Sequence, residues 1–278
     1  MAGQEFTGNA FVTGGGSGIS KAICVAFARR GVRGLVIADI NLELAIKTAA
    51  ESKAVAINPE FRVEAYQLDV AHPESVQNAI DRMADTFGRI DYVINGAAVL
   101  GEYNEVSETG LDTLRRTFEV NVQGSFLVLK AATKVMASQK PVVIDESLPA
   151  RGVSRGVIVN ISSVVGIIGL PKIVQCVASK HAVIGLTKTA ALDNIKHNIR
   201  VNCVSPSWVD TPVVQTAVKS LPSLEKTIES HLPMGRMGLP EEIADVVLFL
   251  CSPGSSWVNG TNFIVDGAMT VGPCSPDM

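Results

Sequence analysis

The chain has 278 residues, 47% of them hydrophobic and 18% charged, which is enough apolar material for one large core. We therefore expect a single domain over residues 1–278. The formal net charge of −3, with no stripe of lysine or arginine, argues against nucleic acid and anionic membranes as partners. The apolar runs fall short of the ~20 residues that a membrane span needs, and residues 1–11 lack the basic and then apolar pattern of a signal peptide. These features predict a soluble, cytoplasmic protein.

The cysteines are scattered, and no CxxC pair or Cys/His cluster occurs among them. This spacing predicts neither a disulfide framework nor a metal site. We expect reduced thiols, most of them in the core, at Cys24, Cys176, Cys203, Cys251 and Cys274.

Short β-branched runs alternate with stretches of helical period along the chain. Strands are predicted at 9–13, 34–39, 61–70, 91–95, 156–162, 199–205 and 261–267, and helices at 17–30, 42–55, 74–87, 111–136, 173–194, 213–230 and 240–250. This order implies βαβ units, because parallel strands need long crossovers. We predict an α/β, Rossmann-type, doubly wound parallel sheet of about seven strands with helices on both faces. Residues 138–155 are long for a helix-to-strand loop and should form a surface excursion.

A glycine-rich turn follows the first predicted strand and opens the first helix, with the sequence TGGGSGIS over residues 13–20. Glycines allow a tight turn and close approach of backbone, while the free N–H groups at a helix start favour a pyrophosphate. The alternative interpretation of these glycines is a flexible turn without a ligand. The position of the segment between a predicted strand and a predicted helix favours the nucleotide site.

Asp39 ends the second predicted strand, 21 residues after Gly18. At this distance an acidic side chain can accept hydrogen bonds from the adenosine ribose hydroxyls, and it would repel a 2′-phosphate. No arginine adjoins it to attract that phosphate, so NAD(H) is expected as cofactor in preference to NADP(H). The alternative role for Asp39 is that of a helix N-cap.

These motifs, with others in order behind them, resemble the short-chain dehydrogenase/reductase family over essentially the whole chain. Its TGxxxGxG signature has Ser20 in place of the last glycine, and its NNAG element is degraded to NGAA at 95–98. Further matches are LDV at 68–70, NVQG at 121–124, ISS at 161–163, ASK at 178–180 and PSWVDTP at 206–212. The resemblance implies cofactor contacts from Gly14, Ser17, Gly18, Ile19, Asp39, Asp69, Val70, Asn95, Lys180, Val209 and Thr211.

In the resembling enzymes a serine, a tyrosine, a lysine and an asparagine form the catalytic site, and this chain places Ser163, Cys176, Lys180 and Asn121 at those positions. Serine steadies the substrate oxygen, tyrosine exchanges its proton, and lysine holds the ribose; the asparagine carbonyl holds a water of the proton relay. Cys176 and Lys180 are four residues apart and share one helix face. Ser162 offers the same chemistry as Ser163, and only the spacing to position 176 favours the latter.

Cysteine at the tyrosine position changes the expected chemistry. A phenol oxygen lies roughly 3–4 Å farther from the backbone than a cysteine sulfur does. A thiol is more acidic than a phenol, and a neighbouring Lys180 should favour its thiolate. Cys176 therefore has three interpretations: a small buried residue that marks a lost tyrosine, part of a redesigned redox site in which water or another group moves the proton, or part of a site for non-redox chemistry.

Ligands of open parallel sheets bind beyond the carboxyl ends of the strands, which here places substrate near residues 99–105, 164–174 and 208–232. These loops are largely apolar, so a small hydrophobic alcohol or ketone, polycyclic or aliphatic, is the expected substrate, although core packing explains the same residues equally well. Tyr103 is expected to line the site. Residues 211–232 are expected to form a lid. The resemblance also implies a homotetramer or homodimer.

We therefore expect an NAD(H)-dependent oxidoreductase that interconverts a hydrophobic secondary alcohol and a ketone, with proton transfer altered or impaired at Cys176. A non-redox isomerase or cyclase on the same fold is the rival enzyme class. A nucleotide-binding protein without turnover is the third hypothesis.

Overall fold

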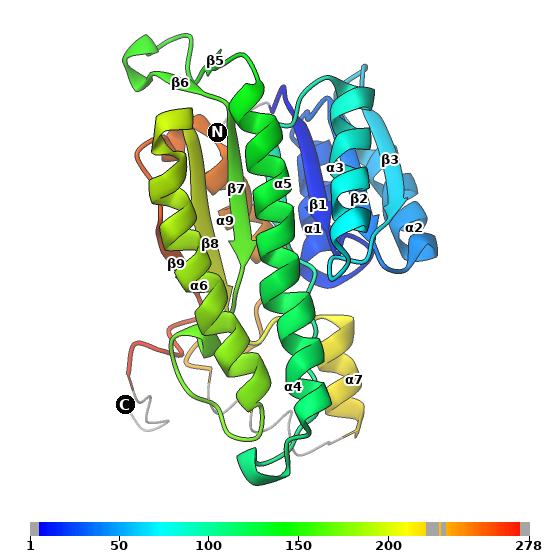
Figure 1. Cartoon of the computed structure of the whole chain (residues 1–278), viewed down its shortest axis with the longest axis vertical. Coiled ribbons are helices and arrows are strands. Elements are labelled where there is room, and N and C mark those ends of the chain that lie inside the picture. The colour runs from blue at the N-terminus through cyan, green and yellow to red at the C-terminus, as the bar shows by residue number, and fades with distance from the viewer. Residues whose placement is uncertain (1–5, 221–227, 229–231, 273–278) are drawn as a thin grey trace.

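The computed structural model describes residues 6–220, 228 and 232–272. Seven strands form one parallel sheet in the order β3-β2-β1-β4-β7-β8-β9 (Figure 1). Their bounds are β1 (Asn9–Thr13), β2 (Gly34–Asp39), β3 (Arg62–Gln67), β4 (Tyr92–Asn95), β7 (Gly156–Ile161), β8 (Ile199–Pro206) and β9 (Asn262–Val265). The predicted sheet is confirmed, although β3 and β9 are shorter than the runs from which they were predicted.

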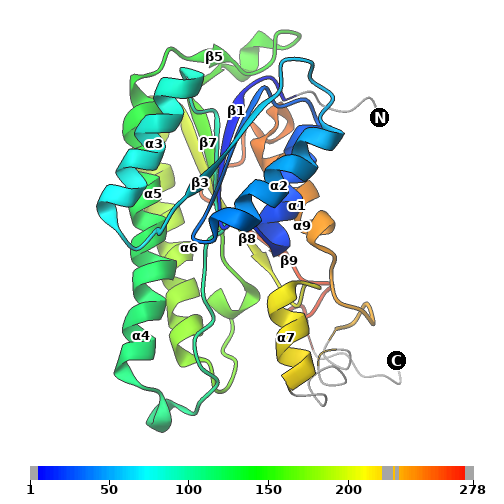
Figure 2. The ribbon, with the colours of Figure 1, turned by 90° about the vertical axis from the view of Figure 1, so that its right-hand side faces the viewer.

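Helices cover both faces of this sheet, as predicted. In Figure 2, α1, α2 and α9 lie on one side of the strands, and α3, α5 and α6 lie on the other. The bounds are α1 (Gly18–Arg29), α2 (Leu42–Val55), α3 (Pro73–Phe87), α4 (Leu111–Phe118), α5 (Ser125–Ser138), α6 (Val174–Asn194), α7 (Pro212–Ser220) and α9 (Pro240–Cys251). Among the helices of the described residues, none is long and apolar enough to cross a bilayer.

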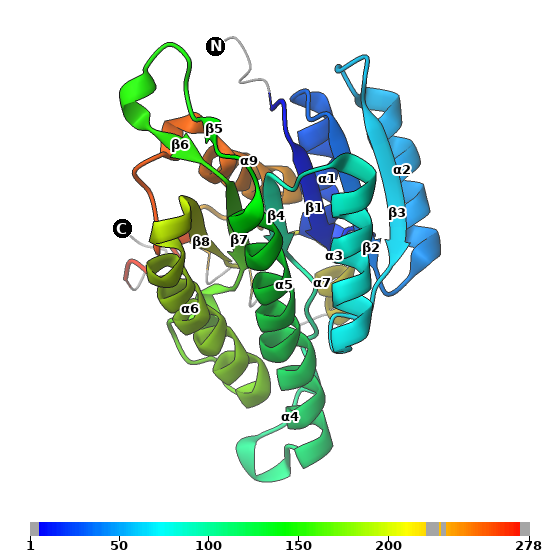
Figure 3. The same cartoon turned by 45° about the horizontal axis from the view of Figure 1, so that its top comes forward.

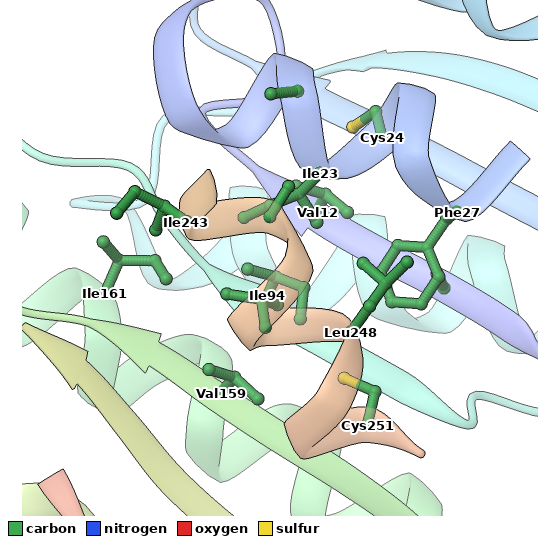
Figure 4. Packing of buried hydrophobic residues seen from close by; sticks show 14 of the residues in the cluster. Val12, Ile23, Cys24, Phe27, Ile94, Val159, Ile161, Ile243, Leu248 and Cys251 are labelled. Carbon is green, nitrogen blue, oxygen red and sulfur yellow. The ribbon is translucent and has the colours of Figure 1, made fainter. Parts of the chain in front are cut away.

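Two separate apolar cores explain this arrangement. Successive residues of a strand point to opposite faces, so that Ala10 and Val12 of β1 join one core while Phe11 joins the other. Figure 4 shows the first core, in which Ile23 and Phe27 of α1 meet Leu248 of α9 above the central strands. Strands β1, β2 and β7 are buried on both sides, which is why their residues are mostly apolar, whereas the edge strand β3 alternates polar and apolar residues.

The order in which the chain adds strands reverses at β1, which lies in the interior of the sheet. β1 pairs in parallel with β2 on one side and with β4 on the other, so the loops after these strands leave the same edge of the sheet. In Figures 1 and 2 the strand arrows point toward the end of the molecule that carries α4 and α7. The predicted site residues lie at this end.

A chain of buried polar side chains crosses the sheet below this edge. Asn95 Nδ2 of β4 donates to Asn160 Oδ1 of β7 at 2.8 Å, and Asn160 Nδ2 donates to Thr187 Oγ1 of α6 at 2.8 Å. Thr187 donates in turn to the Val183 carbonyl at 2.9 Å. Buried amides need such partners, so this chain ties β4, β7 and α6 together in one register.

Three segments differ from the prediction or go beyond it. The predicted helix over 111–136 is divided by a π-helical segment, Glu119–Gly124, between α4 and α5. Residues 138–155 lie on the surface, and they include an antiparallel hairpin of β5 (Val142–Val143) and β6 (Val153–Ser154), which projects from the body of the molecule in Figure 3 and lies at the end opposite α7 in Figure 1. The predicted helix over 213–230 begins as α7, and its continuation at 221–227 and 229–231 lies outside the described residues.

The described cysteines are free and buried, as expected from the sequence; Cys274 lies outside the described residues. Burial raises the pKa of Cys203 to about 11 and that of Cys251 to about 12. Burial disfavours the charged thiolate, so these thiols stay protonated in the folded chain at pH values where the unfolded chain ionises.

We predict that the free energy of unfolding falls as the pH rises above about 9, because each folded thiol has a raised pKa. This contribution to stability is complete below the unfolded pKa and is lost as the pH approaches 11 to 12. Urea unfolding of Cys251→Ala between pH 8 and 10.5 should show a shallower decline than the original chain, with a total difference of about 2 kcal/mol over this range and a limiting slope of about 1.4 kcal/mol per pH unit. Parallel curves for the two proteins would contradict this explanation.

Candidate active site

The glycine-rich turn is a tight backbone structure from which side chains are excluded. Gly14 and Gly18 have φ angles of 66° and 55°, a region that favours glycine. A Cβ atom built on Gly14 would lie 2.9 Å from the Cα of Ala97, in the loop after β4, and one built on Gly18 would lie 3.3 Å from Cγ2 of Thr211. The turn therefore lies where the loops after β1, β4 and β8 meet, as expected for residues of one site.

Asp39 faces this turn from the end of β2. Its Oδ2 accepts a hydrogen bond from the Gly16 N–H at 2.9 Å, and its Oδ1 accepts one from the Asn41 N–H at 2.9 Å. Asn41 is the N-cap of α2, since its side chain accepts from the Leu44 N–H at 3.2 Å. The alternative role of Asp39 as a helix N-cap is therefore wrong, and its carboxylate is fixed beside the glycine turn.

Asp69 and Val70 follow β3 on the same edge of the sheet. The Asp69 carboxylate accepts from the Ala71 N–H at 2.9 Å and lies 3.7 Å from the Arg116 guanidinium of α4. Val70 lies against the π-helical segment, where a Cβ on Gly124 would come within 2.7 Å of its Cγ2. These residues connect the carboxyl end of β3 to α4, and their contacts with the cofactor stay a prediction.

The remaining predicted cofactor residues have mixed surroundings. Asn95 is buried and uses its side chain in the polar chain across the sheet. Ser17 is the N-cap residue of α1, but its side chain makes no capping hydrogen bond. Ile19 packs against the first core, and Val209 is buried and forms an isolated bridge with Gly238.

Two departures from the family pattern compensate each other. A Cβ atom built on Gly96 would lie 2.0 Å from Oγ of Ser20, which no real structure tolerates. Ser20 replaces a glycine of the TGxxxGxG signature, and Gly96 replaces an asparagine of the NNAG element. The serine hydroxyl therefore occupies space that the missing side chain at position 96 leaves open. Each departure is visible in the sequence, but their contact is not, because the two positions are 76 residues apart.

We predict that Gly96→Ala destabilises the folded protein by about 1–3 kcal/mol, because the new methyl group overlaps Ser20. The double variant Gly96→Ala with Ser20→Gly should recover most of this loss. A double-mutant cycle on urea unfolding measures the coupling, for which we expect at least 1 kcal/mol. If the changes in unfolding free energy of the two substitutions are additive, the two positions are not coupled and the predicted steric overlap is wrong.

Asn121 lies in the π-helical segment and not in the α-helix that the sequence predicted. Its side chain accepts from the Val99 N–H at 2.8 Å and donates to the Val99 carbonyl at 2.9 Å. It also donates to Ser179 of α6 at 3.0 Å, while its own carbonyl accepts from Ser125 at 2.7 Å. Asn121 thus joins the loop after β4 to α6 at the predicted catalytic end.

The structure distinguishes the two adjacent serines after β7. Ser162 is buried, and its hydroxyl donates to the Lys180 carbonyl at 3.0 Å. Ser163 is half-buried; its hydroxyl donates to the Pro206 carbonyl at 3.3 Å and accepts from the Val165 N–H at 3.4 Å. Ser163 is therefore the more available of the two for a ligand at the ends of β7 and β8, and its catalytic role stays a prediction.

Lys180 is a buried cation without a carboxylate in an ion pair among the described residues. Its Nζ donates to the Ile161 carbonyl at 2.8 Å, at the end of β7. Burial lowers the pKa of Lys180, and the Cys176 and Cys203 thiols oppose this shift. The ammonium group is thus held at the carboxyl edge of the sheet by the last residue of β7.

Cys176 is 6% exposed and belongs to a small apolar cluster. The cluster consists of Val164, Val165, Ile173 and Cys176, with Leu170, Val177 and Met269 packed against it. Burial raises the pKa of Cys176, and the opposing effect of Lys180 is smaller. The expectation that Lys180 favours the thiolate is confirmed for that one interaction, but the net pKa is raised because the desolvation of the thiol is the larger effect.

The loop after β4 contains Tyr103 and lies against the start of α6. Tyr103 is 57% exposed, and the Lys172 ammonium lies 5.6 Å from its ring centroid. Gln175, which the sequence analysis did not single out, is fully buried and donates to two carbonyls of this loop. No local sequence signal identifies it, because its acceptors are backbone atoms more than 70 residues away.

Comparisons with known proteins agree with this geometry. A family model described as enoyl-(acyl carrier protein) reductase matches residues 14–270. The short-chain dehydrogenase srdC of Neurospora crassa is 50% identical over 269 residues, which cover 96% of this chain and 98% of that protein. Cyclohexanol dehydrogenase of an Acinetobacter species is 37% identical over 261 residues, which cover 94% of either protein. The crystal structure of levodione reductase has a TM-score of 0.87 at 30% identity and covers 97% of this chain and 100% of that one.

Proposed function

Since this chain belongs to the short-chain dehydrogenase/reductase family, we propose that it is an NAD(H)-dependent oxidoreductase that interconverts a hydrophobic secondary alcohol and a ketone. The observation that carries this proposal is the meeting of the glycine-rich turn with Asp39 and Thr211 at the carboxyl ends of the strands. We further propose that the enzyme is a cytoplasmic homo-oligomer. The lid predicted over 211–232 lies in part outside the described residues.

The residues of the turn fit a dinucleotide. Positive φ angles at Gly14 and Gly18 bring bare backbone to the surface of the turn, and the first N–H groups of α1 have no partner within the helix. Such N–H groups bind a pyrophosphate. The Asp39 carboxylate beside them supports NAD(H) over NADP(H), because it would repel a 2′-phosphate.

The reaction needs a hydride and a proton. NADH, when bound, supplies the hydride to the carbonyl carbon, and the carbonyl oxygen must then gain one proton to become the alcohol. Ser163 supports the developing oxyanion by hydrogen bonding, and Lys180 holds a positive charge at the edge of the sheet. Neither group replaces the phenol that the family places at position 176.

Cys176 supports the interpretation of a small buried residue at a lost tyrosine position. Its thiol lies in an apolar cluster, and its raised pKa disfavours the thiolate that would form if the thiol gave its proton to the substrate. We therefore propose that water supplies the proton and that the catalysed rate is low. The same cluster gives the site an apolar wall, which supports a hydrophobic substrate; the names of cyclohexanol dehydrogenase and levodione reductase are consistent with a cyclic alcohol or ketone.

We predict that Cys176→Tyr raises kcat for a cyclic ketone by about 10²-fold or more, because it restores a positioned general acid. Absorbance at 340 nm follows NADH oxidation with cyclohexanone and cyclohexane-1,2-dione as substrates. Cys176→Ala should match the original chain, since the thiol contributes no proton in this proposal. A large loss of rate in Cys176→Ala would instead identify the thiol as the acid.

Two further outcomes would favour the rival functions. Conversion of substrate without any change in NADH would indicate a non-redox isomerase or cyclase. A folded Cys176→Tyr variant that binds NADH but has no turnover on any ketone would indicate a nucleotide-binding protein. The melting temperature of each variant must be measured, because tyrosine is larger than the space that Cys176 fills.

We predict that the original chain binds NADH at least about 10-fold more tightly than NADPH, and that Asp39→Ala narrows this ratio to about unity. Removing the carboxylate takes away both its ribose hydrogen bonds and its repulsion of the 2′-phosphate. Calorimetric titration with both nucleotides measures the ratio. Tighter binding of NADPH by the original chain would refute the role of Asp39, and no binding of either nucleotide would remove the basis of the enzymatic proposal.

A further inference from the structure

Gln175 closes the loop after β4 onto the first turn of α6. Its Nε2 donates to the Leu100 carbonyl at 3.1 Å and to the Glu102 carbonyl at 2.6 Å. The side chain is fully buried, and it immediately precedes Cys176. One amide group therefore binds the backbone carbonyls of the residues before and after Gly101. Gly101 is two residues before Tyr103 in the chain.

The backbone around this contact is built for close approach. Gly101 has a φ angle of 79°, and a Cβ atom at this position would lie 2.8 Å from Gln175 Nε2 and 3.0 Å from Thr117 Oγ1 of α4. Lys172, two residues before the start of α6, has a φ angle of 68°, which is strained for a residue with a side chain. Its carbonyl accepts from the Asn104 N–H at 2.9 Å. The loop is thus enclosed between α4 and α6, at a cost in backbone strain.

The amide group of Gln175 is itself only half satisfied. Its Oε1 is buried and has no hydrogen-bond partner, although a buried acceptor without a partner is costly. A methionine or leucine would fill similar space without this cost. The donor side of the amide must therefore supply the benefit, and its two acceptors are both in the loop that carries Tyr103.

We propose that Gln175 is a positioning residue for the substrate: it fixes residues 100–102, and with them Tyr103, as a rigid wall of the substrate pocket beside Cys176. This inference rests on the proposed function for the identity of the pocket. Asn121 holds the preceding residue, Val99, through its own side chain, so two buried amides fix consecutive parts of one loop. The loop is then a preformed surface and does not close over the substrate.

Gln139 provides a matched control at the other end of the sheet. Its Nε2 also donates to two backbone carbonyls, those of Ile90 at 3.0 Å and Arg155 at 2.7 Å. A Gln→Glu substitution at either position removes the N–H donors and places a carboxylate against two carbonyl oxygens. Both variants should lose stability, but only the substitution at position 175 should affect the loop and the substrate.

The experiment compares Gln175→Glu, Gln175→Met and Gln139→Glu with the original chain by hydrogen exchange and kinetics. In both position-175 variants, protection factors of amides 99–104 should fall about 10-fold. KM for cyclohexanone should rise about 5–10-fold, with kcat changed less than about twofold and the Kd of NADH unchanged. In Gln175→Glu, protection should partly return as the pH falls, because a protonated carboxyl group can donate one hydrogen bond.

Unchanged protection of amides 99–104 in both position-175 variants would overturn the proposal, as would lost protection without a rise in KM. A similar rise in KM in Gln139→Glu would also overturn it, since the effect would then follow general destabilisation. Failure of the original chain to bind NADH would contradict the proposed function itself. The exchange measurement does not depend on turnover, so the two failures are distinguishable.

Discussion

The parallel pairing of β1 with both β2 and β4 is the constraint on which the site depends. This pairing places the turn after β1 between the Asp39 carboxylate from one neighbouring strand and Ala97 from the other. Only a turn free of side chains fits there, because the distances from Gly14 and Gly16 to these neighbours leave no room for a Cβ atom. The sheet order therefore dictates the glycines, and the glycines expose the N–H groups that suit a dinucleotide.

Much of this arrangement could be predicted from the sequence because its signals are local. Strand, glycine turn and helix are adjacent in the chain, and Asp39 ends the next strand at a readable spacing. The contacts of Gln175 could not be predicted in this way, because its partners are main-chain carbonyls, which every residue type carries. The π-helical segment around Asn121 likewise leaves no mark in the apolar periodicity that predicted one continuous helix.

The protonation of Cys176 shows a second limit of sequence reasoning. The spacing to Lys180 correctly indicates a neighbouring cation, but it contains no information on burial. Burial depends on Val164, Val165 and Ile173, which surround the thiol in the folded chain and outweigh the lysine. The spacing of two residues on a helix therefore predicts the direction in which the charge of one shifts the pKa of the other. The net pKa shift also depends on desolvation, which is known only from the fold.

The polar chain from Asn95 through Asn160 to Thr187 has a consequence for how this protein can change over time. Each member is a hydrogen-bond partner of its neighbour inside an apolar sheet. Replacing one member alone by an apolar residue therefore leaves a buried polar group without a partner, which is costly. Routes from this trio to an all-hydrocarbon interior pass through less fit intermediates. We expect lineages derived from this sequence to keep the trio intact or to exchange it as a whole, while the surface hairpin diverges freely.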